Sequence, residues 1–144
     1  MNGRKLAGPV IALLVAVSVY ALWPRVKLSP EDEIKALVAK VIASAEKRDA
    51  PGVTAALADT FHGGGLGKQE LNQLVFGQFF QARQIVVLNP RLEVFVSSPT
   101  EGSFKGTFLF ARDGAAPDAS SYTIEAEVQK TGKAWQITTA SWTH

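Results

Sequence analysis

The sequence predicts an α+β protein: three helices packed on a curved antiparallel sheet of four to five strands, preceded by one transmembrane or signal helix. Three observations support this. Residues 6–24 carry no charge, residues 29–83 repeat apolar side chains at helical spacing, and residues 85–142 alternate apolar and polar side chains. We therefore divide the chain into an N-terminal segment, 1–27, and one domain, 28–144.

The first segment opens with Arg4 and Lys5 and continues as an uncharged run. As a helix this run would span roughly 28 Å, close to the thickness of the bilayer core. We expect Leu6 to Trp23 to cross the lipid bilayer as a signal-anchor, with a cytoplasmic N-terminus and an exported, periplasmic domain. The alternatives are a signal peptide cleaved near Ala21, which would release a secreted domain, and a buried soluble helix.

The basic character of the chain belongs to this first segment. The pI is near 9.0 and the net charge is +2, but all 13 acidic residues follow residue 28. The later lysines and arginines are scattered and form no stripe that could follow a phosphate backbone, so we expect no nucleic-acid partner. The chain has no cysteine, which excludes disulfides and thiol nucleophiles.

Three helices are expected next. The first starts at Ser29-Pro30 with a serine cap and acids in its first turn, and runs to about Arg48. Asp49 is expected to cap a short second helix with Val53, Ala56 and Leu57 facing inward, which the glycines at 63–67 end. The third helix is expected from Lys68 to about Arg83.

The strands follow. IVVL (85–88) is a short strand or an extended lead-in, and four strands are expected at 91–98, 103–112, 121–130 and 134–142. Short connections favour an antiparallel meander. The alternation gives an apolar inner face of Leu92, Val94, Val96, Phe104, Phe108, Phe110, Ile124, Ala126, Val128, Trp135 and Ile137. It gives a polar outer face that includes Glu93, Lys105, Glu125 and Glu127.

In this order of elements the chain resembles the nuclear-transport-factor-2-like (NTF2-like, SnoaL-like, cystatin-like cone) superfamily. The resemblance covers about residues 30–142 and lies in the phrases KRDAPGVTAALADTF, KQELNQLVFGQFF and KAWQITTASW. It implies a cone-shaped fold with a cavity. The superfamily contains isomerases, dehydratases and cyclases as well as domains that bind or assemble, so the resemblance predicts the fold rather than one activity.

The glycine run at 63–67 does not fit a nucleotide-binding loop. A phosphate-binding loop needs glycine where His62 stands and a hydroxyl where Gln69 stands, and a dinucleotide fingerprint needs glycine in place of Lys68. The run is interpreted as a helix end, a turn with left-handed angles and a helix start.

His62 and Asp59 would share one face if the short helix continued, and the carboxylate would then orient the imidazole. A histidine at a helix C-terminus is equally favourable without any catalysis, and Asp59 could simply be solvated. A zinc site needs further ligands, and the only other histidine is His144. We expect no metal and no cofactor.

The inward strand positions offer little catalytic chemistry. The isomerase branch implies a carboxylate base and acidic donors inside the cone. Here Tyr122 is the one inward phenol, and the inward neighbours are aliphatic or aromatic. Phe79, Phe108, Tyr122 and Trp135, together with Asp59 and His62, are the pocket-lining candidates, and no catalytic residue is assigned.

Phe95, Leu109 and Trp142 interrupt the polar outer face or its edge and are the candidates for a protein contact, with a homodimer or an envelope protein as the partner. The sequence therefore predicts a membrane-anchored binding or assembly domain, more a binder than an enzyme. The alternative is an enzyme or carrier for a small apolar molecule, of the isomerase or dehydratase type, that uses the cone pocket. A tethered structural module without ligand or partner is a third interpretation.

Overall fold

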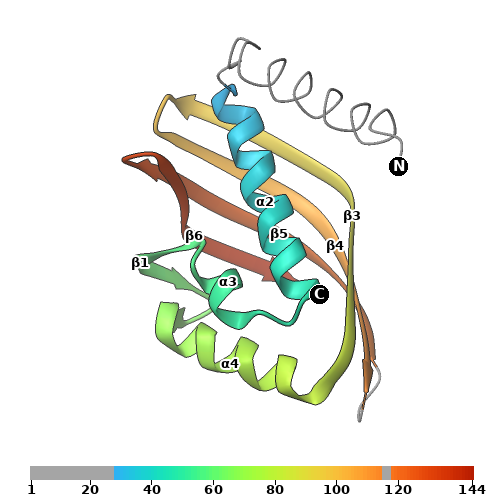
Figure 1. Cartoon of the computed structure of the whole chain (residues 1–144). Helices are drawn as coiled ribbons and strands as arrows, with labels where there is room; N and C mark the ends of the chain where they lie inside the picture. The colour runs from blue at the N-terminus through green and yellow to red at the C-terminus, as the bar shows by residue number, and fades with distance from the viewer. Residues whose placement is uncertain (1–27, 115–117) are drawn as a thin grey trace, which may run out of the picture.

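The domain is built on one six-stranded sheet. The computed structural model describes residues 28–114 and 118–144, and the predicted anchor at 1–27 lies outside them. The strands stand in the order β2-β1-β6-β5-β4-β3 (Figure 1). Their bounds are β1 Leu57–Gly63, β2 Leu66–Gly67, β3 Ala82–Ser98, β4 Glu101–Gly114, β5 Asp118–Thr131 and β6 Ala134–Thr143.

Three helices cover the concave side of this sheet: α2 (Pro30–Glu46), α3 (Ala50–Thr54) and α4 (Lys68–Gln81) (Figure 1). The predicted α+β class, with helices on a curved sheet, is confirmed. The sheet has six strands rather than four to five, and it is mixed rather than antiparallel because β1 runs parallel to β6.

The N-terminus of α2 forms as its sequence predicts. The Ser29 hydroxyl accepts a hydrogen bond from the Asp32 amide (3.2 Å), Pro30 occupies the first turn, and three acids lie near the positive end of the helix dipole. The helix ends at Glu46, and Arg48 follows with a positive φ of 57°. The Arg48 side chain donates to the Ala82 carbonyl (2.6 Å) and so holds the junction between α4 and β3.

The prediction for residues 55–63 was wrong. Asp49 caps α3 through the Gly52 amide (3.1 Å) as expected, but the helix ends at Thr54 and β1 begins at Leu57. The segment becomes a strand because β6 offers it a free edge: the Ile137 amide donates to the Ala56 carbonyl (2.8 Å), and Leu57 pairs with Ile137. No pattern in the neighbouring sequence predicts this parallel pairing, because the partner of Leu57 lies about eighty residues away in the sequence.

The glycine run turns a strand rather than ending a helix. Gly64 and Gly65 have φ of 57° and 78° and connect β1 to β2, which supports the expectation of left-handed angles but not that of a helix end.

Two other element boundaries differ from the prediction. Helix α4 stops at Gln81, and β3 is one strand across 82–98, with a register irregularity between Leu88 and Arg91 where Pro90 interrupts the ladder.

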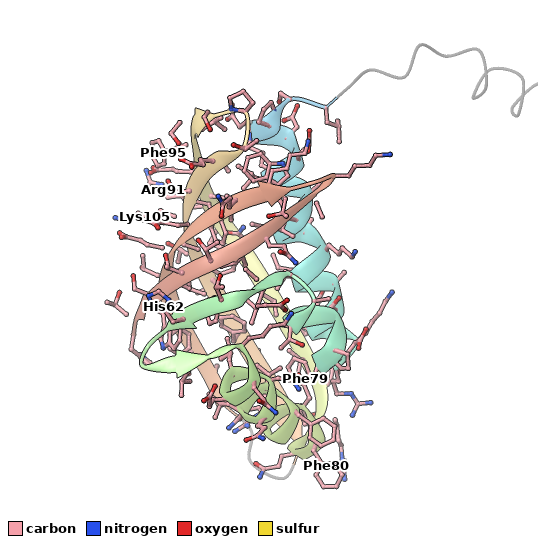
Figure 2. All side chains as sticks on the ribbon, turned by 90° about the vertical axis from the view of Figure 1, so that its left-hand side faces the viewer. His62, Phe79, Phe80, Arg91, Phe95 and Lys105 are labelled. Atoms are coloured by element: carbon pink, nitrogen blue, oxygen red, sulfur yellow. The ribbon has the colours of Figure 1, made fainter. Side chains whose placement is uncertain are left out.

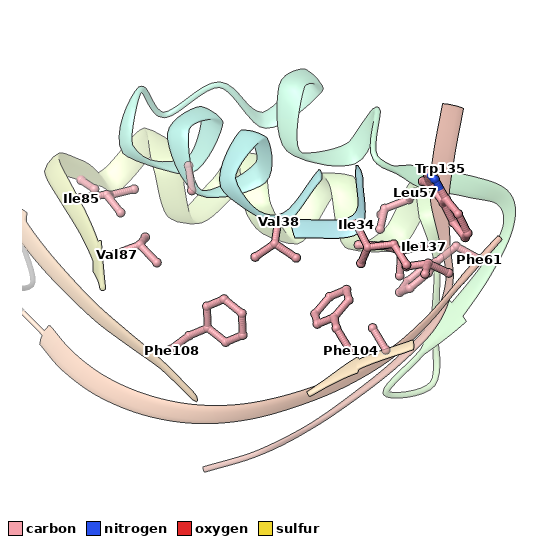
Figure 3. Packing of buried hydrophobic residues seen from close by; sticks show 14 residues of the cluster. Ile34, Val38, Leu57, Phe61, Ile85, Val87, Phe104, Phe108, Trp135 and Ile137 are labelled. Atoms are coloured by element: carbon pink, nitrogen blue, oxygen red, sulfur yellow. The ribbon is translucent and has the colours of Figure 1, made fainter. Parts of the chain in front are cut away.

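The core lies between α2 and the concave face of the sheet (Figure 3). Ile34 and Val38 of α2 meet Phe104, Phe108, Val128 and Ile137 of the strands. Most of the predicted inner face is buried or packs against this core. Val96 is the exception and is exposed, since it pairs with Gly102 beside the β3–β4 hairpin, at the end of the sheet.

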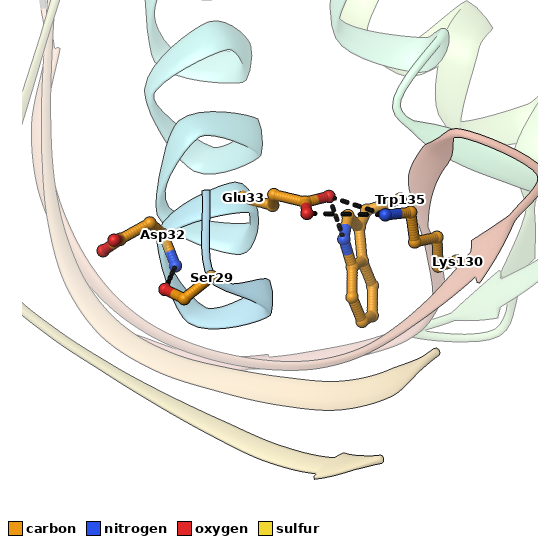
Figure 4. A network of polar contacts seen from close by, with 5 residues as sticks. All are labelled: Ser29, Asp32, Glu33, Lys130 and Trp135. Carbon is orange, nitrogen blue, oxygen red and sulfur yellow. Dashed lines mark hydrogen bonds and ion pairs between the residues drawn. The ribbon is translucent and has the colours of Figure 1, made fainter. Parts of the chain in front are cut away.

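A buried polar contact closes one end of this core. The Trp135 indole donates to the Glu33 carboxylate (2.9 Å), and the Lys130 ammonium lies 3.0 Å from the same oxygen (Figure 4). Both charged side chains are largely withdrawn from water. The network joins the first turn of α2 to β5 and β6, so it fixes where the helix crosses the sheet.

Candidate functional site

The principal candidate site is an apolar cavity of about 680 Å³, partly open to solvent, that is bounded by α2, α4 and the concave face of the sheet. This volume lies within the range of small-molecule pockets, roughly 300–1,000 Å³. Helix α4 borders the cavity without burying any residue completely: Leu71 and Phe79 pack against the core but remain partly exposed. Space that side chains of a close-packed helix would fill is therefore open.

Aliphatic and aromatic side chains form most of the cavity wall. Helix α2 supplies Val38, Val41, Ile42 and Ala45, and α4 supplies Leu71, Leu74, Val75 and Phe79. The floor comes from the strands, chiefly Phe104, Phe108 and Phe110 of β4 with Ile85 and Val87 of β3. The rings of Phe108 and Phe110 stack at 6.4 Å, so the floor presents a continuous aromatic surface.

Four of the described residues that line the cavity have polar side chains: Gln78, Arg112, Ser120 and Tyr122. An Arg112 guanidinium N–H donates to the Gln78 side-chain oxygen. The Tyr122 ring meets Phe110 edge-on at 5.7 Å and contacts the His144 ring at 4.7 Å. Among the described residues that line the cavity there is no carboxylate and no imidazole. The site thus has a mainly apolar wall, with Arg112 as its one charged side chain among the described lining residues.

Three of the six predicted pocket residues line this cavity: Phe79, Phe108 and Tyr122. Trp135 is buried (6% exposed), but its indole serves the contact with Glu33 at the other end of the core. Trp142, predicted as a partner-surface residue at the sheet edge, is 37% exposed and also lines the cavity, and its role in a protein contact stays a prediction.

Asp59 and His62 do not reach the cavity. They stand on β1, so the helical spacing that would bring them to one face is absent. The Asp59 side chain is 98% exposed and pairs with Lys68 (3.2 Å), and His62 is also exposed (Figure 2). Asp59 lines a separate, polar cleft with Lys68, Gln69, Glu70, Thr54 and Asn72.

Phe95 and Leu109 lie exposed on the sheet, as predicted, but far from each other. Phe95 pairs with Ser103, whereas Leu109 lies six residues further along β4, or about 20 Å at 3.3 Å per residue. Charged side chains such as Arg91 and Lys105 lie on the same side of the molecule as Phe95 (Figure 2). The two apolar residues thus form no continuous patch, and their role in pairing stays a prediction.

Sequence reasoning missed Arg112, Ser120 and Gln78, although the signal was present. Phe108, Phe110 and Arg112 continue one period-two row of β4, and Ile124, Tyr122 and Ser120 form the facing row of β5. Extending the alternation to the strand ends would have placed a cation and a hydroxyl in the same two inward rows as the phenol.

Within residues 28–114 and 118–144, no three His, Asp or Glu side chains come together as a set of metal ligands. In the same ranges no helix has the length and apolarity needed to cross a bilayer.

No protein-family profile matches the sequence, and neither does any curated protein. Solved structures do match in fold. A proposed scytalone dehydratase from Novosphingobium aromaticivorans aligns with a TM-score of 0.70 at 11% identity, over 77% of this chain and 80% of its own. The type-3 hexachlorocyclohexane dehydrochlorinase LinA from Novosphingobium barchaimii aligns with a TM-score of 0.64 at 12% identity, over 78% and 84%.

A third matching structure is described as a member of the NTF2-like family. A proposed dehydratase of the NTF2-like family from Streptomyces avermitilis aligns with a TM-score of 0.66 at 12% identity, over 78% of this chain and 93% of its own. The domain therefore has the NTF2-like, cone-shaped fold that its order of elements predicts. At these identities the likeness concerns the fold alone.

Proposed function

We propose that the domain binds a small, mainly apolar organic molecule in the cone cavity. The cavity itself carries this proposal: its volume is about 680 Å³, its wall is mostly aliphatic, three phenylalanines form its floor, and few of its described lining residues are polar. Burial of apolar ligand surface supplies affinity, and a few placed polar groups supply orientation. The structural neighbours named as a dehydratase and a dehydrochlorinase agree with a small-molecule ligand.

Within this proposal we favour a binding protein or carrier over an enzyme. Elimination chemistry needs a base that removes a proton, usually a carboxylate or an imidazole. The described cavity lining offers neither, and Tyr122 is its one acidic hydroxyl. An enzyme of the dehydratase type is the second candidate, favoured by the names of the structural neighbours.

A neutral fluorescent probe, N-phenyl-1-naphthylamine, tests binding to the full chain. The variant Val41→Trp adds an indole to the cavity wall, and we expect it to weaken probe binding at least tenfold. The matched control is Val86→Trp, since Val86 lies on β3 outside the lining and should leave binding within about twofold of wild type.

The Val41→Trp protein also provides the background fluorescence, since probe that partitions into detergent or lipid gives the same signal with this variant as with wild type. Its melting temperature shows whether it has folded, and Val75→Trp on α4 fills the same cavity from another element. Folded variants at both positions that bind the probe as wild type does would refute the cavity as the binding site.

We further propose that Leu6 to Trp23 hold this domain at a membrane, with the domain on the exported side. The uncharged run, the flanking cations and the interfacial Tyr20 and Trp23 support the proposal. Fractionation and the intact mass of the full chain test it. A membrane-bound product beginning at or near Met1 is expected, and a soluble product beginning near Leu22 would contradict it.

A further inference from the structure

Arg112 is the one charged side chain among the described residues that line the cavity. It stands on the row of β4 that also carries Phe108 and Phe110. The side chain is half-buried, and its position beyond the phenylalanines places a cation at the end of this row of the cavity floor. A ligand that fills the cavity would bring its terminal group to this guanidinium.

Among the described residues, the hydrogen-bond partner of Arg112 is neutral. One guanidinium N–H donates to Gln78, and no described carboxylate lies within ion-pair distance of the side chain. A guanidinium has five N–H donors and stays protonated at physiological pH. Arg112 is only partly withdrawn from water, so an anion that covers it would pair with its charge at little extra desolvation cost to the guanidinium.

We propose that the ligand of the cavity is a monoanionic carboxylate with an apolar body, whose carboxylate binds Arg112. This inference rests on the proposed small-molecule function and names its ligand class. The planar guanidinium fork matches the two oxygens of a carboxylate. Because the described lining supplies one cation, a single negative charge is balanced, whereas a phosphate dianion would keep an excess charge in an apolar site.

Other lining groups fit such a ligand. Ser120 pairs with Phe110, one step of the cavity-facing row from Arg112, and Tyr122 pairs with Phe108, one step further along β5. The stacked Phe108 and Phe110 rings receive the apolar body. Asp118 is the backbone partner of Arg112 in the β4–β5 register, so its contribution is tested directly below.

The test compares isosteric charged and neutral competitors of N-phenyl-1-naphthylamine on the full chain: 2-naphthoate against 2-naphthamide, and octanoate against octanamide. We expect the carboxylate of at least one pair to bind about tenfold or more tightly than its amide. Arg112→Gln should remove that preference and leave amide affinity within about twofold. Arg91→Gln is the matched control, an exposed arginine that does not line the cavity (Figure 2).

Three results would overturn the inference: equal affinity for carboxylate and amide in both pairs, an unchanged preference in folded Arg112→Gln, or carboxylate binding that appears only in Asp118→Asn. The last would mean that Asp118 already serves as the counter-ion. Each of these can occur while the neutral probe still binds and Val41→Trp still blocks it. Failure of the inference is therefore distinct from failure of the proposed function, in which the probe itself does not bind.

Discussion

Glu33 links the first turn of α2 to the sheet. Its carboxylate accepts from the Trp135 indole and pairs with Lys130, joining one helix turn to two strands (Figure 4). We expect Glu33→Ala to lower the free energy of unfolding by about 1–3 kcal/mol, because it leaves a buried indole N–H and a shielded ammonium without this acceptor.

Glu31→Ala is the matched control for that change. Glu31 lies in the same helix turn, so both substitutions remove a similar interaction with the helix dipole. Its one ion pair, with Lys35 at 3.6 Å, is solvent-exposed and should contribute no more than about 0.5 kcal/mol. Urea denaturation measures both, and equal losses would show that the Trp135 contact is not the source of stability.

For single residues, the sequence predicted the side chains whose surroundings are set by their near neighbours in the chain. It missed side chains at the end of a strand, whose surroundings depend on distant elements. The Ser29 and Asp49 caps follow from their immediate neighbours, and both were predicted correctly. Phe108 and Tyr122 follow from alternation. Arg112 was missed because an arginine at the end of an apolar row is ordinarily solvated, although the alternation of β4 continues to it.

Among the elements, β1 shows most clearly which structure the neighbouring residues in the sequence do not predict. LADTFHG carries apolar residues compatible with a short helix, but it forms a strand because β6 supplies a parallel edge. The pairing is long-range, so no neighbour in the sequence announces it. The proposed Asp59–His62 pair failed with the helix, since it depended on helical spacing. In contrast, the antiparallel strands β3 to β6 were expected, because their short connections and alternation are local signals.

The β1–β2 turn supports a prediction for this element. A Cβ at Gly64 would lie 2.6 Å from the Trp142 ring, whereas a Cβ at Gly65 would meet nothing within 4 Å, and both residues have positive φ. Gly65→Ala should lower stability by about 1 kcal/mol through backbone strain alone. Gly64→Ala should cost about 1–3 kcal/mol more, since the ring must also move. Chemical denaturation compares the two, and equal costs would contradict the contact with Trp142.

For the whole molecule, one packing feature explains both the cavity and the surface. Helix α4 spans the cavity without burying any residue, so its inner side chains line open space while Phe80 on its outer side is 83% exposed. A sequence can show that α4 is apolar on several sides. It cannot show how far a helix stands from its sheet, because that distance depends on every side chain between them.

The most direct test of the account is to locate an apolar ligand on the molecule. A neutral aryl diazirine, photolysed with the full chain and mapped by peptide mass spectrometry, labels the residues that surround it. The account predicts adducts on lining positions of α4 and β4, such as Leu74, Phe79 and Phe110, that Val41→Trp suppresses. Adducts confined to the outer sheet face around Phe95, or unchanged by Val41→Trp, would contradict it.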